Sequence, residues 1–163
     1  VATDSYDVDG EVTATLPVPL LTLDELNKLA AEFIGDQMQT PPMVSAVKKD
    51  GVPLYKLARK GVEVQREPRL IHIYRFRFSS YSEPLGHFQL ACTKGTYVRS
   101  VAHELGQKVG CGAHLATLRR VNSGKFDVAD AMPLDAILKL TQAELEKRVL
   151  PFLKLVNLDA PKR

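Results

Sequence analysis

Apolar residues spaced three and four apart predict an amphipathic helix that begins near position 23. Thr22 and Glu25 stand at capping-box spacing, in which each residue satisfies a free backbone N–H of the first helical turn. The apolar face predicted for this helix consists of Leu26, Leu29, Ala30, Phe33 and Ile34. Because glycine commonly stands just beyond the last helical residue, Gly35 predicts the end of this helix.

A second helix with one apolar face is predicted over residues 98–109. Its apolar positions are Val98, Val101, Ala102, Leu105 and Val109, and Gly110 follows them directly. Shorter helices are predicted over residues 54–60 and from Pro133 onward, where Thr141 and Glu144 repeat the capping-box spacing. Helical segments are therefore spread along the chain and separated by segments of a different period.

Alternation of apolar and polar residues predicts strands over residues 11–16, 70–78 and 88–92. The second strand is expected to carry His72, Tyr74, Phe76 and Phe78 on one face, and Ile71, Ile73, Arg75 and Arg77 on the other. An aromatic row of this kind is typical of a core, and a surface on which bases stack is the alternative. The polar residues 79–87 predict a connection, so the last two strands are expected to form an antiparallel hairpin.

Interleaved helices and paired strands predict an α+β fold with a mixed, mainly antiparallel sheet flanked by helices. The 163 residues are 45% apolar and 25% charged, which is enough for one compact core. No apolar run approaches the ~20 residues of a membrane span, and the first residues lack the pattern of a secretory signal. The two cysteines, Cys92 and Cys111, are too few for a disulfide framework, so we expect a cytoplasmic protein.

Charge is distributed unevenly along a chain whose net charge is only +3. Residues 1–36 are mainly acidic, whereas bases outnumber acids in residues 48–77 and 94–125. Two basic blocks on a nearly neutral chain favour binding to the phosphate backbone of a nucleic acid. The alternative is a set of solvated surface charges balanced by the acidic first segment.

The candidate chemistry centres on Tyr97 and Arg99, which follow a turn at Gly95 and stand at the start of the second predicted helix. A guanidinium binds a carboxylate or a phosphate through two parallel hydrogen bonds, and a tyrosine offers a flat face to a base. These properties suit a pocket for a planar, phosphate-bearing ligand. The alternative is a core tyrosine beside an arginine that pairs with a nearby acid.

Other chemistry has less support in the sequence. The chain contains no Walker loop, no dinucleotide-binding glycine pattern and no nucleophile elbow. His103, Cys111 and His114 supply only one Cys-x-x-His pair, which is too little to predict zinc. The acidic turn that ends at Gly10 lacks the spacing and the closing glutamate of a calcium loop. We therefore expect no metal.

Several motifs occur in a fixed order along nearly the whole chain. They are Thr3-Asp-Ser with Asp7-x-Asp-Gly10, Phe33-Ile-Gly35, Gln39-Thr-Pro-Pro-Met-Val-Ser45-Ala-Val-Lys48, Gly51-Val-Pro-Leu-Tyr55-Lys-Leu-Ala-Arg59-Lys-Gly61, Arg66 with Arg69, Lys94-Gly-Thr-Tyr97-Val-Arg99, and Gly110-Cys-Gly-Ala-His114-Leu-Ala-Thr-Leu118-Arg-Arg120. With these motifs, the chain resembles the bacterial tRNA pseudouridine synthases of the TruB type. Members of that family convert the T-arm uridine 55 to pseudouridine.

The resemblance implies a role for each matching residue. Arg99 is expected to pair with the catalytic aspartate, Tyr97 to line the pocket for the flipped uracil, and Leu118 to pack against the base. Lys94 and Gly95 are expected to shape the pocket floor. The residues expected to contact the tRNA backbone are Lys48, Lys49, Arg59, Lys60, Arg119 and Arg120. The resemblance also implies the T-arm stem-loop of tRNA as the partner, no metal or organic cofactor, and no obligate protein partner.

One part of the family pattern does not occur in these 163 residues. The family's nucleophilic aspartate lies in a Leu-Asp-Pro-x-Ala-Thr-Gly-like segment, and a second tyrosine stacks on the uracil; we expect both upstream of Val1. Residues 1–150 are then the C-terminal portion of a catalytic domain that is incomplete at its N-terminus. Residues 151–163 are expected to be a tail or the start of a C-terminal RNA-binding domain. The residues of this chain alone are expected to be inactive.

Two further hypotheses stand beside the isomerase: a catalytically silent RNA-binding or RNA-chaperone module, and a structural protein with a basic face. The isomerase hypothesis expects Tyr97, Arg99 and Leu118 to converge on one cavity. Scattered positions of these three side chains, or an Arg99 side chain buried against an acid of this same chain, would overturn it.

Overall fold

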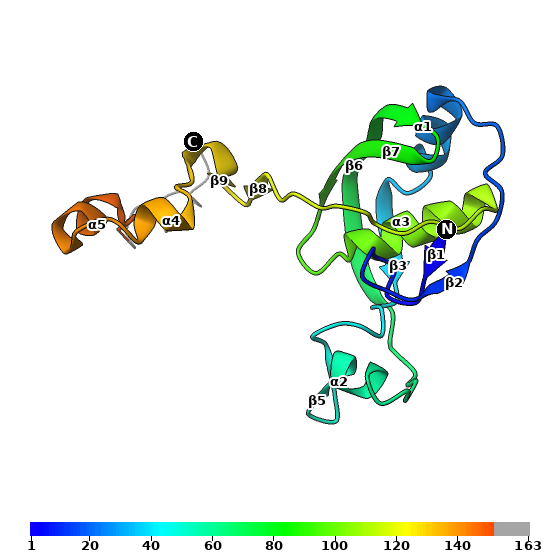
Figure 1. Cartoon of the computed structure of the whole chain (residues 1–163), viewed down its shortest axis with the longest axis horizontal. Coiled ribbons are helices and arrows are strands. Elements are labelled where there is room, and N and C mark those ends of the chain that lie inside the picture. The colour runs from blue at the N-terminus through cyan, green and yellow to red at the C-terminus, as the bar shows by residue number, and fades with distance from the viewer. Residues whose placement is uncertain (152–163) are drawn as a thin grey trace. The chain divides into compact units, whose positions relative to one another are not determined.

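The computed structural model describes residues 1–151, and the chain divides into two compact units, residues 1–117 and the residues from 118 onward (Figure 1). The boundary expected after residue 150 stays a prediction, since residues 152–163 lie outside the described residues. Over residues 1–151, no helix has both the length and the apolar character needed to cross a membrane.

The first unit is built on a three-stranded antiparallel sheet with two helices packed against it. The strands are β3 (Gly35–Gln39), β6 (Arg69–Ser82) and β7 (Leu85–Cys92), in the order β3-β6-β7. The helices are α1 (Leu23–Ala31) and α3 (Val98–Val109), and Figure 1 shows them with the long β6–β7 hairpin in green. The expected hairpin and the α+β class are confirmed. The strands pair as far as Ser82 and Leu85, so their connection is shorter than predicted.

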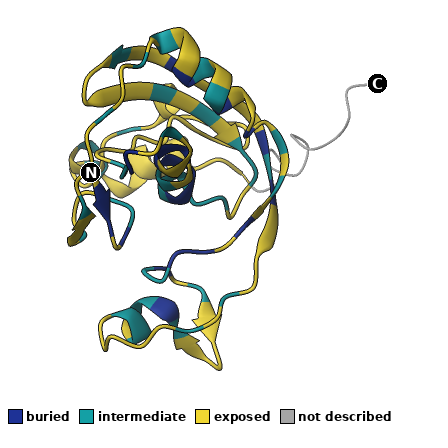
Figure 2. Cartoon of the chain, turned by 90° about the vertical axis from the view of Figure 1, so that its right-hand side faces the viewer, coloured by how far each residue is buried: buried dark blue, intermediate teal, exposed yellow. Residues whose placement is uncertain are grey.

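The core of the first unit lies between this sheet and the two helices. Its buried members are Leu26, Ala30, Phe33, Ile71, Ile73, Phe76, Phe78, Val101 and Leu105. Phe76 contacts Phe33 edge-on with the ring centroids 5.9 Å apart, and Phe88 of β7 at 5.1 Å. Aromatic pairs of this geometry add to the free energy of apolar burial. The buried residues of both helices and of the strands are dark blue in Figure 2.

Strand β6 contains a bulge that changes which side chains face the core. Ile73 pairs with Cys92, whereas Arg75 pairs with Ala91, the next residue along β7. Tyr74 is therefore an extra residue on β6. An extra residue inverts the alternation of side chains that follows it, because the side-chain period of a strand is two.

The predicted aromatic row on β6 is wrong for this reason. Tyr74 is 62% exposed and His72 is half-buried. The core face of β6 instead carries Ile71 and Ile73 before the bulge, and Phe76 and Phe78 after it. The arginines predicted to share a face with the isoleucines, Arg75 and Arg77, are both exposed. The core interpretation holds only for the two phenylalanines.

Most ends of the longer helices follow the sequence signals, but α1 ends at Ala31 and not at Gly35, which begins β3. The backbone N–H groups of Phe33 and Ile34 bond to carbonyls three residues back, a tighter turn that ends the helix and leaves Ile34 47% exposed. Thr22 Oγ1 accepts a hydrogen bond from the backbone N–H of Glu25 over 3.2 Å, and Glu25 Oε2 accepts one from the backbone N–H of Thr22 over 2.8 Å. Helix α5 (Gln142–Arg148) begins with a capping box of the same kind. Helix α3 ends at Gly110, whose φ of 86° lies in the left-handed region that glycine adopts without strain.

The remaining elements are short. In the first unit, β1 (Ala2–Thr3) pairs with β2 (Val12–Ala14), and β4 (Lys48–Lys49) pairs with β5 (Val52–Pro53), which α2 (Leu54–Ala58) follows. The second unit consists of β8 (Asn122–Ser123), β9 (Phe126–Asp127), a 3-10 turn (Val128–Asp130), α4 (Leu134–Ile137) and α5. No residue is buried among residues 118–151.

Gly106 sets how closely α3 approaches the segment that follows it. A Cβ at this position would lie 2.2 Å from the backbone nitrogen of Ala113. We expect Gly106→Ala to lower the free energy of unfolding by about 3 kcal/mol, because the helix and the segment must separate. Gly110→Ala is the matched control: it meets no atom within 4 Å, and its left-handed backbone alone costs about 1 kcal/mol. Urea denaturation measures the loss in free energy of unfolding for each variant. Equal losses in the two variants would contradict the close approach of α3 to Ala113.

Candidate active site at the start of helix α3

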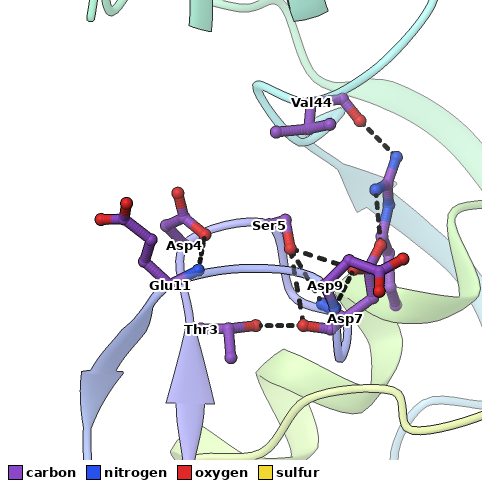
Figure 3. A network of polar contacts seen from close by, with 8 residues as sticks. Thr3, Asp4, Ser5, Asp7, Asp9, Glu11 and Val44 are labelled. Atoms are coloured by element: carbon purple, nitrogen blue, oxygen red, sulfur yellow. Dashed lines mark hydrogen bonds and ion pairs between the residues drawn. The ribbon is translucent and has the colours of Figure 1, made fainter. Parts of the chain in front are cut away.

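An acidic turn between β1 and β2 carries the carboxylate at the centre of the site (Figure 3). Asp7 Oδ1 accepts hydrogen bonds from Ser5 Oγ and from the backbone N–H of Asp9, each over 3.1 Å. The backbone carbonyl of Asp7 accepts a hydrogen bond from Thr3 Oγ1 over 2.7 Å. Ser5 and Thr3 are both buried. The turn itself therefore holds the Asp7 carboxylate in one orientation.

Arg99, in the first turn of α3, binds this carboxylate and one further acceptor. Its Nη1 donates to Asp7 Oδ2 over 3.0 Å, and its Nη2 donates to the backbone carbonyl of Val44. The Arg99 and Asp7 side chains are 19% and 30% exposed. Water therefore screens this ion pair less than it screens a pair on the surface. Arg99 joins the acidic turn, the segment at Val44 and helix α3.

This pairing is the alternative that the sequence left open for Arg99. Among residues 1–151, the carboxylate on Arg99 comes from this chain. The expectation that Arg99 is not buried against an acid of this chain is therefore wrong. A guanidinium has five N–H groups, and two of them are engaged by Asp7 and Val44. Three N–H groups remain for another acceptor, and the catalytic role of Arg99 stays a prediction.

Tyr97 is held beside Arg99 by the amide of a buried glutamine. Gln39, at the end of β3, accepts from the backbone N–H of Tyr97 through Oε1 over 2.7 Å and donates to its carbonyl through Nε2 over 3.2 Å. Gln39 is only 3% exposed, and both of its polar atoms are satisfied. The Arg99 guanidinium carbon lies 5.8 Å from the centre of the Tyr97 ring. The structure therefore brings these two predicted residues together.

The turn before α3 is anchored to strand β6. The Thr93 N–H donates to the carbonyl of His72, and Thr93 Oγ1 accepts from the N–H of His72, each over 2.9 Å. Thr96 Oγ1 donates to the Thr93 carbonyl over 2.9 Å. Gly95 turns the chain with a φ of 87°, and Lys94 is exposed. The role of Lys94 and Gly95 in the pocket floor stays a prediction.

Residues 44–66 form a basic arm between β3 and β6 (Figure 1, with α2 and β5 at its end). The four residues of the arm that are predicted to contact RNA are all exposed: Lys48, Lys49, Arg59 and Lys60. Lys49 Nζ donates to the carbonyl of Gln65 over 3.1 Å, and Arg66 Nη1 donates to the carbonyl of Pro41 over 3.3 Å. The Lys49 bond links β4 to the returning segment of the arm, and the Arg66 bond links that segment to Pro41. The side chains of Lys48, Arg59 and Lys60 remain exposed.

Three predicted site residues belong to the second unit, which begins at Leu118. Leu118 is 62% exposed, and Arg119 and Arg120 are exposed as well. The convergence of Leu118 with Tyr97 and Arg99 stays a prediction.

Sequence patterns did not identify Asp7 or Gln39 as site residues. Asp7 and Gln39 both stand in motifs that carry the family resemblance, but no role was assigned to either residue. The local signal at Asp7, the clustering of Thr3, Ser5 and Asp7, is typical of many surface turns. Gln39 stands before two prolines, and a buried amide has no periodic signature. Each residue contacts a partner far along the chain, 92 residues away for Asp7 and 58 for Gln39.

The residues weighed as zinc ligands have other contacts. The ring of His103 stacks on Tyr6 with the centroids 3.9 Å apart, and His114 Nδ1 lies 3.0 Å from the carbonyl oxygen of Val1. Within the described part of the chain, no group of three or more His, Cys, Asp or Glu side chains is close enough to hold a metal ion. The expectation of no metal stays a prediction.

Comparison with known proteins identifies the class to which this fold belongs. Residues 1–98 match the family model of the TruB family pseudouridylate synthase N-terminal domain, and residues 99–157 match that of the tRNA pseudouridylate synthase B C-terminal domain. A chain from the crystal structure of a Cbf5-Nop10-Gar1 complex has a TM-score of 0.64 and 25% identity, covering 84% of this chain and 39% of that chain. The fold and the motifs together are those of the pseudouridine synthases.

Within that class, this chain belongs to the TruB family. It is 59% identical to the tRNA pseudouridine synthase B of Opitutus terrae, over 91% of this chain and 62% of that protein. The corresponding enzyme of Syntrophotalea carbinolica is 47% identical, over 83% of this chain and 44% of that protein. The tRNA pseudouridine synthase B of Dechloromonas aromatica is 40% identical, over 99% of this chain and 56% of that protein. The chain spans less than two thirds of the length of each relative.

The half-buried His103 predicts a dependence of stability on pH. Burial lowers the pKa of His103 below its ordinary value of 6.5, and a backbone contact with Ala113 opposes part of that effect. The unfolded chain then binds more protons than the folded one, so stability falls as pH drops below about 6.5 and stops falling below the lowered pKa. We expect the melting temperature to drop less between pH 7.5 and 5.5 in His103→Gln than in the wild type. Equal drops would contradict this.

Proposed function

We propose that the protein carrying this chain is a tRNA pseudouridine synthase that isomerises the T-arm uridine 55 to pseudouridine. The observation that carries the proposal is the start of α3, where Tyr97 and Arg99, both part of one family motif, lie together. Family membership supports the reaction class. Relatives named tRNA pseudouridine synthase B support tRNA as the substrate.

The reaction breaks the bond between uracil N1 and ribose C1′ and forms a bond between C1′ and C5 of the same base. The proton lost from C5 is balanced by the proton gained at N1, so the product is an isomer of the substrate. The resemblance assigns the attack on the nucleotide to an aspartate that these 163 residues do not include. Arg99 has three N–H groups beyond those on Asp7 and Val44, enough to bind that second carboxylate. With Asp7 on one side, the guanidinium presents its remaining donors in one orientation. Such a preorganised donor supplies the positioning and electrostatic stabilisation that the reaction needs.

The target base must leave its stack, because the bond to be broken is inaccessible inside the RNA fold. Extrusion of a base costs a few kcal/mol, which contacts in the pocket offset. In this proposal Tyr97 lines the pocket with its ring and Leu118 packs against the uracil, while Lys94 and Gly95 shape the floor. The glutamine contact fixes the backbone of Tyr97, so its ring meets the base in a restricted set of positions.

The basic arm supplies the contacts to the tRNA backbone in this proposal. Its exposed bases and those of the second unit bind phosphates and set affinity more than sequence preference; they are Lys48, Lys49, Arg59, Lys60, Arg119 and Arg120. The T-arm stem-loop is the proposed ligand. We place the enzyme in the cytoplasm, with no metal, organic cofactor or obligate protein partner. The free thiols of Cys92 and Cys111 suit a reducing compartment.

A catalytically silent RNA-binding or RNA-chaperone module is the second candidate function. The Asp7–Arg99 ion pair favours it, because a guanidinium already neutralised by a carboxylate gives less electrostatic help to another one. The basic arm serves this function equally well. The two candidate functions predict different results for Arg99→Ala: only the synthase has a rate of pseudouridine formation that the substitution can lower.

Replacement of Arg99 separates the two functions. In the full-length protein, we expect Arg99→Ala to lower the single-turnover rate of pseudouridine formation by about 10²- to 10³-fold, because a preorganised donor is lost. The dissociation constant for tRNA is expected to rise only a few-fold. Arg99→Lys keeps the charge but loses the planar fork, and an intermediate rate is expected. Pseudouridine release assays and filter binding measure the two quantities.

Arg59→Ala is the matched control, since it removes an exposed arginine of the arm. Its signature is the reverse: tRNA affinity falls, and the slope of log affinity against log salt becomes smaller by about 1. Equal losses of affinity and rate in Arg99→Ala would identify Arg99 as a plain phosphate contact. A wild-type protein that binds tRNA without forming pseudouridine would support the silent module.

A further inference from the structure

Tyr6 has a backbone conformation that residues with a Cβ rarely adopt. Its φ is 65°, and Asp50 is the only other non-glycine residue with a positive φ that the structure records in residues 1–151. The left-handed region costs an L-residue about 1–2 kcal/mol. A residue stays in it only where its surroundings offset that cost. The contacts of Tyr6 therefore identify what holds the acidic turn in place.

The side chain of Tyr6 stacks on a ring of helix α3. The centroids of the Tyr6 and His103 rings lie 3.9 Å apart, with the planes 17° from parallel. His103 lies one helical turn beyond Arg99 and therefore on the same face of α3. His103 Nδ1 is buried and has no hydrogen-bond partner within the described residues. The imidazole is therefore held by the stack on its face and by a backbone contact with Ala113.

The stack and the ion pair attach consecutive residues of the turn to one helix face. In an extended segment, consecutive side chains point to opposite sides. The left-handed backbone at Tyr6 lets its ring reach His103 while the next side chain, Asp7, reaches Arg99. The Tyr6 carbonyl also accepts a hydrogen bond from the N–H of Leu115 over 2.9 Å. With the left-handed backbone at Tyr6, the ring of Tyr6 and the carboxylate of Asp7 both contact helix α3.

We propose that Tyr6 is a positioning residue: by stacking on His103 it sets the position of Asp7 and, through Asp7, the orientation of Arg99. This inference rests on the proposed function, because it concerns the same site. Tyr6 touches neither substrate nor reacting atoms in this account. Its effect is on the rate of the reaction and not on the affinity for tRNA.

The test compares Tyr6→Phe and Tyr6→Gly in the full-length protein. Phenylalanine keeps the ring, so kcat stays within twofold of the wild type. Glycine removes the ring but adopts the left-handed region without strain, so the variant isolates loss of the stack. We expect its kcat to fall about tenfold with KM for tRNA within twofold of the wild type. Tyr74→Ala, which removes an exposed ring 4.6 Å from that of His72, is the matched control and leaves kcat unchanged.

A double-mutant cycle shows whether Tyr6 acts through Asp7. If it does, Tyr6→Gly lowers kcat no further once Asp7→Asn has already broken the ion pair. Wild-type kcat in Tyr6→Gly, or a second tenfold loss on top of Asp7→Asn, overturns the proposal. A parallel rise in KM and fall in kcat also overturns it, because that result indicates a general disturbance of the fold.

Failure of the proposed function gives a different result, namely a wild-type protein that forms no pseudouridine. The positioning claim is then tested by thermal unfolding. The coupling between Asp7→Asn and Arg99→Ala is measured from shifts in melting temperature, with Tyr6 present and in the Tyr6→Gly background. Coupling that disappears without the ring supports the role of Tyr6. Coupling that persists overturns it.

Discussion

The ion pair between Asp7 and Arg99 joins the parts of the first unit that carry its proposed chemistry. It connects the acidic turn to α3. Arg99 also donates a hydrogen bond to the carbonyl of Val44, and this bond connects α3 to the first residue of the basic arm. Both side chains are largely shielded from water, so removal of either partner leaves a poorly solvated charge. The relative positions of turn, arm and helix therefore depend on this one guanidinium.

The same pair bears on the function in two opposite ways. It neutralises Arg99, which favours a purely structural role, and it fixes the guanidinium while leaving three N–H groups for another acceptor. The second effect suits a site that is completed by a carboxylate from another segment. Gln39 fixes Tyr97 in a comparable way, through its backbone and not through its ring. Membership of the TruB family favours the catalytic interpretation of this rigid arrangement.

The helices and the hairpin were predictable because their signals are local. The capping box at Thr22, the apolar face over residues 98–109 and the stop at Gly110 each involve residues within one or two helical turns. The faces of β6 were not predictable. The bulge at Tyr74 depends on how β6 pairs with β7. The alternation of residues within β6 does not indicate this register, so it could not predict the bulge.

Local patterns were enough to predict the α+β class, the main helices and the β6–β7 hairpin, and the motifs of the TruB family marked Tyr97 and Arg99 as a candidate pair. The contacts of Arg99 with Asp7, of Gln39 with Tyr97 and of Tyr6 with His103 could be recognised only in the folded chain. The cause is distance along the chain. Periodicity and capping report on neighbours a few residues apart, whereas these contacts form only when packing of the whole unit brings remote segments together.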